Sequence, residues 1–140
     1  MDNLVIKRIW YDDELIELQV TAYSDYVSVK QTCYIGKSEL SLIAEKILCF
    51  LENSNTHCYV EFGKKEGNYT PAFSMFINPM DKFGHITIEM DMEIADNAKR
   101  CHRCLFYIHT ECEALHKFGK SLNSISDFSS KVISLIEVTN

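Results

Sequence analysis

The stretch that decides the fold is Gly84-His85-Ile86-Thr87-Ile88-Glu89-Met90-Asp91-Met92-Glu93. Successive side chains of a β-strand point to opposite sides of a sheet, so this alternation separates into two faces. The apolar face carries Ile86, Ile88, Met90 and Met92. The polar face carries His85, Thr87, Glu89, Asp91 and Glu93. The pattern predicts a strand of an antiparallel sheet, with one face in the core and a row of carboxylates facing water.

The composition favours one folded domain that spans residues 1–140. The chain has 140 residues, of which 46% are hydrophobic, enough for a single core. Two prolines and five glycines are too few for a low-complexity or disordered chain. The formal net charge of −6 argues against a nucleic-acid partner, because such a protein needs a basic surface to replace phosphate counterions.

The start of the chain predicts a cytoplasmic protein with no membrane partner. Lys7 and Arg8 interrupt the first apolar residues, so we expect no signal peptide. No stretch approaches the ~18 apolar residues that span a bilayer. In the cytoplasm the six cysteines would stay reduced, and we expect most of them to be small buried apolar residues.

The first half of the chain predicts three strands and a helix. Alternating patterns cover Leu4–Trp10, Leu15–Ala22 and Tyr26–Tyr34, and the second and third strands should form a hairpin. The period then changes, because apolar residues recur every three or four positions from Leu40 to Leu51. Ser38 is the expected N-cap of this amphipathic helix.

The second half predicts more strands and a second helix. We expect strands at His57–Phe62 and Ala72–Ile77, then the acidic-faced strand, then a central strand at Arg100–Thr110. A helix follows from Glu111, with an apolar stripe at Leu115, Phe118 and Leu122.

Two details of this second helix and the tail bear on the packing. Gly119 costs about 1 kcal/mol relative to alanine inside a helix, so its presence predicts a close contact with a neighbouring element. The tail after Ser126 fits a short helix or a strand equally well.

Together these elements predict an α+β fold: a mostly antiparallel, twisted sheet of about six or seven strands, with two main helices packed on one face.

A cluster of cysteines and histidines raises the possibility of a metal site. Cys101, Cys104, Cys112 and His116, with His109 between them, are ligand types that zinc accepts. On a strand, however, Cys101 and Cys104 point to opposite faces. We therefore predict no bound metal, and keep a small metal- or ligand-binding protein as the alternative function.

No pattern in the chain is typical of an enzyme. Cys101 and His102 are neighbours on a predicted strand and face apart, so they do not form a nucleophile and base pair. The carboxylates of Asp12, Asp13 and Glu14 fit an exposed turn. The chain has no glycine-rich phosphate loop and no Gly-x-Ser-x-Gly motif. We predict no catalytic residue and no cofactor.

The acidic face remains the best candidate for a binding surface. Glu89, Asp91 and Glu93, with His85 beyond them, would lie in one row. Like charges in a row repel one another, so an opposing row of basic groups is expected. A partner protein could supply those groups, and so could Lys64 or Arg103 of this chain; an ordinary solvated sheet face would need neither.

The order of elements resembles a known family. The residues that carry the likeness are Leu15-Ile16-Glu17-Leu18, the helix over Leu40–Leu51, the turn Asp81-Lys82-Phe83-Gly84-His85, and the segment Leu115-His116-Lys117-Phe118-Gly119-Lys120-Ser121-Leu122. This pattern is similar to the cytoplasmic immunity proteins of bacterial polymorphic-toxin systems, of the WapI-like kind. The likeness covers roughly residues 15 to 122.

The resemblance implies a function without catalysis. A protein of this family binds a cognate toxin domain and neutralises it, so the partner would be that toxin domain. No catalytic residue, cofactor or metal ligand is carried over. The oligomeric state is not indicated, and a small-ligand site between sheet and helix stays open as a third possibility.

Overall fold

The computed structural model describes residues 2–53, 55–65, 71–97 and 99–136. Within these residues the chain forms eight strands and two helices, which is the predicted α+β class. Their order is β1 (Asn3–Tyr11), β2 (Leu15–Tyr23), β3 (Ser28–Gly36), α1 (Lys37–Glu52), β4 (Cys58–Phe62), β5 (Ala72–Ile77), β6 (His85–Asn97), β7 (Arg100–Glu111), α2 (Cys112–Ser126) and β8 (Val132–Ser134). No helix in this part of the chain is long and apolar enough to cross a membrane.

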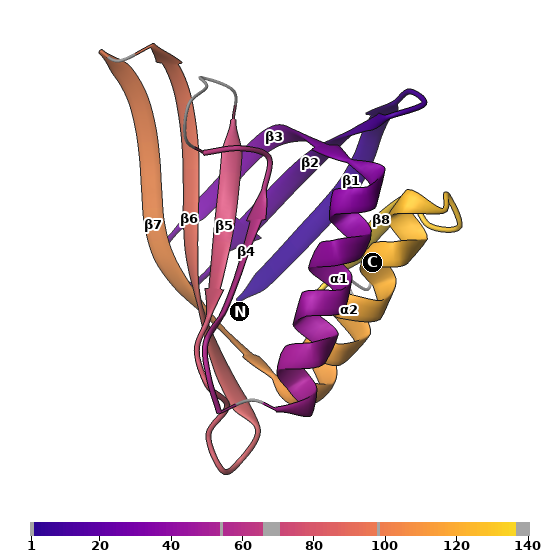
Figure 1. Cartoon of the computed structure of the whole chain (residues 1–140). Coiled ribbons are helices and arrows are strands. Elements are labelled where there is room, and N and C mark those ends of the chain that lie inside the picture. The colour runs from indigo at the N-terminus through magenta and orange to yellow at the C-terminus, as the bar shows by residue number, and fades with distance from the viewer. Residues whose placement is uncertain (1, 54, 66–70, 98, 137–140) are drawn as a thin grey trace.

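The strands form two antiparallel sheets rather than the single sheet of six or seven strands that the sequence predicts. The first sheet has the order β3-β2-β1-β8, and the second has the order β4-β5-β6-β7. Helix α1 follows β3 directly and carries the chain away before β4 begins, so β3 and β4 belong to different sheets. Figure 1 shows the two helices side by side, on one side of the two sheets.

The two faces of β6 lie as the alternation predicts. Ile86, Ile88, Met90 and Met92 are at most 1% exposed and belong to the core. Their neighbours on the polar face point away from the core, because the side-chain period of a strand is two. The register of β6 is therefore the predicted one.

Helix α1 buries the predicted stripe, with a different start. Leu40, Ile43, Ile47 and Phe50 are buried, whereas Leu51 is half-buried at the edge of the core. Burial stabilises each of the larger side chains by roughly 1.5–3 kcal/mol before entropy is counted. The prediction of Ser38 as N-cap is wrong, because the helix already begins at Lys37 and Gly36 is the cap residue, without a side-chain hydrogen bond.

Strand β7 is an edge strand, so the prediction of a central strand is wrong. Its apolar run alternates: Phe106 and Ile108 are buried, whereas Leu105 and Tyr107 are about half exposed. One edge N–H, that of His109, donates to Asp2 Oδ2 at 2.8 Å. The tail forms the short strand β8. It pairs with β1 and is one of the two edge strands of the first sheet.

The cysteines are all reduced, as expected, but they are not mostly buried. All six are free thiols. Cys33 and Cys58 are buried, Cys104 and Cys112 are intermediate, and Cys49 and Cys101 are exposed. Burial raises the pKa of the Cys33 thiol to about 12, so this thiol stays protonated in the core.

A tight turn sets the start of β6. Asp81 Oδ1 accepts hydrogen bonds from the backbone N–H groups of Phe83 and His85, at 2.8 and 2.9 Å. Gly84 has a φ of +83°, which a residue with a Cβ rarely adopts. Its carbonyl accepts from the N–H of Cys112 at 2.9 Å, so the same turn holds the first residue of α2.

Gly119 makes the close contact that the sequence predicts. A Cβ on this residue would lie 3.1 Å from Ile47 Cγ2 and 3.2 Å from Leu48 Cδ2. Gly119 is buried where α2 packs against α1. The glycine lets the two helix backbones approach closely, which offsets its unfavourable helix propensity.

We predict that Gly119→Val lowers the free energy of unfolding by about 1–3 kcal/mol, because the new side chain overpacks the contact with Ile47 and Leu48. Lys120→Val, at the exposed neighbouring position, is the matched control and should cost a few tenths of a kcal/mol through helix propensity. Urea unfolding followed by circular dichroism measures both. Equal stability of the two variants would contradict the close packing of the helices.

Candidate protein-binding surface

The candidate residues lie on the outer face of the second sheet, the face turned away from the core. Directly paired residues of neighbouring strands share a face, so the register assembles this surface from four strands. One row across the sheet consists of Tyr59, Phe76, Glu89 and Tyr107. The next row includes Glu61, Ser74, Asp91 and Leu105. We call the side of the sheet that carries these two rows, together with Glu93 and Arg103 in the row beyond them, the outer face.

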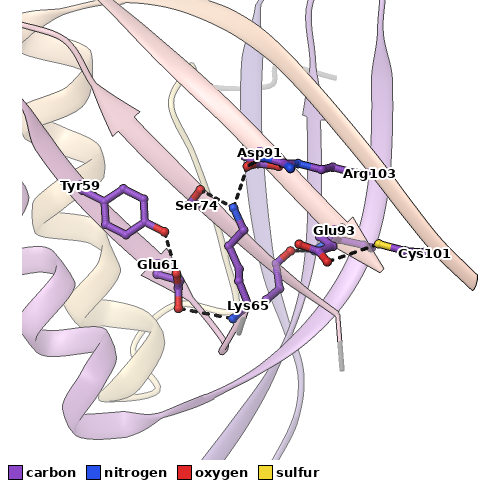
Figure 2. Close-up of polar contacts among 10 residues, drawn as sticks. Tyr59, Glu61, Lys65, Ser74, Asp91, Glu93, Cys101 and Arg103 are labelled. Atoms are coloured by element: carbon purple, nitrogen blue, oxygen red, sulfur yellow. Dashed lines mark hydrogen bonds and ion pairs between the residues drawn. The ribbon is translucent and has the colours of Figure 1, made fainter. Parts of the chain in front are cut away.

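Asp91 is the most restrained residue of this face. The side chain of Arg103 donates to both of its carboxylate oxygens, from Nε at 2.9 Å and from Nη2 at 2.6 Å. Lys65 Nζ lies 2.8 Å from Oδ2 and also donates to Ser74 Oγ at 3.0 Å. Figure 2 shows these groups converging from the loop after β4 and from β5, β6 and β7.

The electrostatic balance at Asp91 keeps it ionised. Asp91 is 6% exposed, and this burial on its own would raise the pKa of the carboxyl. The hydrogen bonds from Arg103 and then from Lys65 outweigh burial and hold the pKa below its ordinary value. Two cations thus surround a single carboxylate, and Asp91 adds no free negative charge to the surface.

Glu89 and Glu93 are more accessible than Asp91, and both are half-buried. Tyr107 donates its hydroxyl to Glu89 Oε2 at 3.2 Å, and the charge of Glu89 raises the pKa of that phenol. Cys101 donates its thiol to Glu93 Oε1 at 3.3 Å, and this hydrogen bond raises the pKa of the thiol. Both of these hydrogen-bond donors are neutral groups, and Glu93 also lies directly opposite Arg103 in the register of β6 and β7.

The edge strand β4 contributes a second tyrosine. Tyr59 donates its hydroxyl to Glu61 Oε1 at 2.6 Å, while the other oxygen of Glu61 accepts from the backbone N–H of Lys65 at 3.4 Å. Burial, and then the hydrogen bond to Glu61, raise the pKa of Tyr59 to about 12. This contact helps to place Lys65 over the sheet.

His85 lies apart from the carboxylates. It is at the start of β6, four residues before Glu89, which corresponds to about 13 Å along a strand. Its Nδ1 is 3.2 Å from Asp81 Oδ2, and both side chains are exposed. His85 therefore belongs to the turn at Asp81 and is separate from the network around Asp91.

The cysteine and histidine cluster does not converge. Cys101 and Cys112 are at opposite ends of β7, roughly 35 Å apart for eleven residues of extended chain. Among the described residues, no group of three or more Cys, His, Asp and Glu side chains is placed to hold a metal ion. The structure thus gives no support to the metal-binding alternative.

A hollow also lies between the end of α1 and the start of β4. It is lined by residues that include Lys46, Cys49, His57 and Tyr59. The ring of His57 stacks on Phe76 at a centroid distance of 4.7 Å, so this imidazole packs against an aromatic ring at one side of the hollow.

Sequence reasoning identified the acidic row and missed most of what surrounds it. Arg103 supplies an opposing charge as expected, but the lysine is Lys65 rather than Lys64. The exposed side chains of Tyr59, Leu105 and Tyr107 were not predicted to lie beside the carboxylates. The alternation along β7 could have placed Leu105 and Tyr107 on one face. Tyr59 could be placed beside them only once the order of the strands in the sheet was known.

Comparison with known proteins shows a likeness in fold alone. No protein-family model matches the chain, and no curated protein matches it. The solved structure of the plant transcriptional regulator PBF-2 is similar, with a TM-score of 0.51 and 11% sequence identity, over 91% of this chain and 77% of that chain. The MRP1/MRP2 structure of Trypanosoma bruciei gives a TM-score of 0.43 at 11% identity, over 90% and 78% of the respective chains. The likeness to PBF-2 shows a shared arrangement of strands and helices.

We predict that Asp91→Asn lowers the free energy of unfolding by about 2 kcal/mol at pH 7, because it removes the charge that holds Lys65 and Arg103. The pKa of this carboxyl is lowered in the folded protein. Its stabilisation is therefore present above the ordinary pKa of 3.8 and is lost as the pH falls through the folded value. The difference in the free energy of unfolding between wild type and variant should therefore narrow as the pH falls below 3.8.

Urea unfolding across this pH range measures the effect of Asp91→Asn. Glu93→Gln is the control on the same strand, with an expected loss below about 0.5 kcal/mol, because the hydrogen bond described for Glu93 comes from a thiol, which is a weak donor. A loss for Asp91→Asn that does not change with pH would contradict the ionised network.

Proposed function

We propose that this protein is a non-enzymatic immunity protein that acts in the cytoplasm, where it binds a cognate bacterial toxin domain and neutralises it. The observation that carries the proposal is the pattern of exposure on the outer face. Tyr59, Leu105 and Tyr107 are 44%, 50% and 49% exposed, and Glu89 lies between the two tyrosines in one row. The resemblance of the chain to polymorphic-toxin immunity proteins supplies the class of partner.

A sheet surface of this kind suits a protein partner. Tyrosine is enriched among the residues that dominate binding energy, because it buries a large rigid surface and keeps a polar tip. On the outer face the tyrosine hydroxyls are held by Glu61 and Glu89, so the rings are already oriented. Little side-chain entropy would then be lost on binding, which favours affinity.

The charge of the surface suits a basic toxin. Glu89 and Glu93 are half-buried acidic side chains, while the charge of Asp91 is balanced within the protein. Exposed carboxylates mainly speed association and select a partner, whereas affinity depends on the apolar anchors. A nucleic-acid partner is not part of the proposal, because the chain carries a net charge of −6.

We predict that co-expression with a toxin domain encoded immediately upstream restores growth and that the two proteins co-purify. Replacing both Leu105 and Tyr107 by alanine should weaken the complex at least tenfold, because it removes two exposed anchors. Tyr26→Ala is the matched control, since Tyr26 is 95% exposed and lies in the turn between β2 and β3. Continued killing by the toxin, with no co-purification, would contradict the proposal.

The contribution of charge can be measured separately. Glu89→Gln with Glu93→Gln should slow association and flatten its dependence on salt, because salt screens exposed charges within about 8 Å at physiological ionic strength. Asp91 stays unchanged in this variant, since it holds the fold of the surface. Glu45→Gln with Glu52→Gln on α1 removes the same charge elsewhere and serves as the control in stopped-flow measurements. Identical kinetics of the two variants would place the interface away from Glu89 and Glu93.

A further inference from the structure

The first sheet carries a second feature on its own outer face. Trp10 on β1 pairs with Glu17 on β2, and Glu17 pairs with Tyr34 on β3. Directly opposite residues on neighbouring antiparallel strands project from the same face. The three side chains therefore form one row across the sheet, with the carboxylate between two aromatic rings. We call this row the Trp10–Glu17–Tyr34 row.

The two rings lean toward each other over the central strand. Their centroids are 6.2 Å apart and their planes make an angle of 81°. Trp10 is 45% exposed and Tyr34 is 46% exposed, so both aromatic side chains are partly open to solvent. Two nearly perpendicular aromatic walls with a carboxylate beside them are the elements of a site for an organic cation.

The row has no cation of its own in the part of the chain that the structure describes. The cations found there over aromatic rings contact Tyr11, Phe83 and Phe128. No salt bridge involves Glu17 within residues 2–53, 55–65, 71–97 and 99–136. The carboxylate of Glu17, on the same face as two partly exposed rings, is thus available to a group from outside.

We propose that the Trp10–Glu17–Tyr34 row binds an arginine side chain of a protein partner. The guanidinium group is planar, stacks on aromatic faces and donates two parallel hydrogen bonds to a carboxylate, so it uses both features of the row. This proposal does not depend on toxin neutralisation, because it concerns the other sheet and a single side chain.

The surroundings of the row are complementary to a basic protein segment. Asp13 and Glu14 are exposed in the turn between β1 and β2, two to four residues beyond Trp10 and Tyr11. The turn is shaped by Asp12, whose carboxylate accepts from the N–H groups of Glu14 and Leu15 at 2.8 and 2.7 Å. Leu15 is 41% exposed and adds an apolar contact at the same end of the sheet.

Fluorescence tests the proposal directly, because Trp10 is the one tryptophan of the chain. The probe is the blocked peptide acetyl-Gly-Arg-Gly-amide, and its control is the same peptide with citrulline, which has the same shape without the charge. We expect a saturable change of Trp10 emission with the arginine peptide and none with the citrulline peptide. Glu17→Gln should weaken binding fivefold or more, and Glu45→Gln on α1 should leave it unchanged.

Two further measurements keep the result decisive. Tyr34→Leu removes one ring wall while keeping every charge, and it should also weaken binding of the arginine peptide fivefold or more. An equal response to the arginine and citrulline peptides, in the wild-type protein, would overturn the proposal. So would a saturable response to oligothymidylate, because that would assign the rings to the stacking of bases.

Discussion

The register of β6 between β5 and β7 is the constraint on which the rest of the structure depends. A slip of one residue would turn Ile88 and Met90 outward and place Asp91 in the core. Such a slip would cost the burial of several apolar side chains and leave an uncompensated charge inside. In the observed register, Arg103 of β7 and Lys65 of the loop between β4 and β5 both reach Asp91. The ion network and the apolar face therefore specify the same pairing, and the outer face follows from it.

Local patterns in the sequence were sufficient to predict most of the strands and both helices. The alternation around Ile86 and Met90 and the three- to four-residue period from Leu40 depend only on which face each residue presents. Gly119 could be interpreted as a contact, since a glycine inside a helix needs a compensating reason. The division into two sheets and the edge position of β7 depend on how distant segments pair, and a period of two does not encode that pairing.

The candidate surface shows the same limit in another form. Sequence spacing placed Glu89, Asp91 and Glu93 in one row, but the effective charge of each depends on neighbours from other strands. Asp91 is neutralised by two cations, whereas among the described residues Glu89 accepts a hydrogen bond from a phenol and Glu93 accepts one from a thiol. The row is therefore better described as a structural centre at Asp91 with partly exposed side chains around it, among them those of Tyr59 and Tyr107.

We propose that the outer face of the second sheet is the surface that contacts the toxin domain. The most direct measurement is the change of NMR chemical shifts in labelled protein when the cognate toxin domain is added. We expect the largest changes on the side chains and amides of Tyr59, Glu89, Leu105 and Tyr107. Changes confined to α1 and α2, with none on β6 or β7, would contradict it.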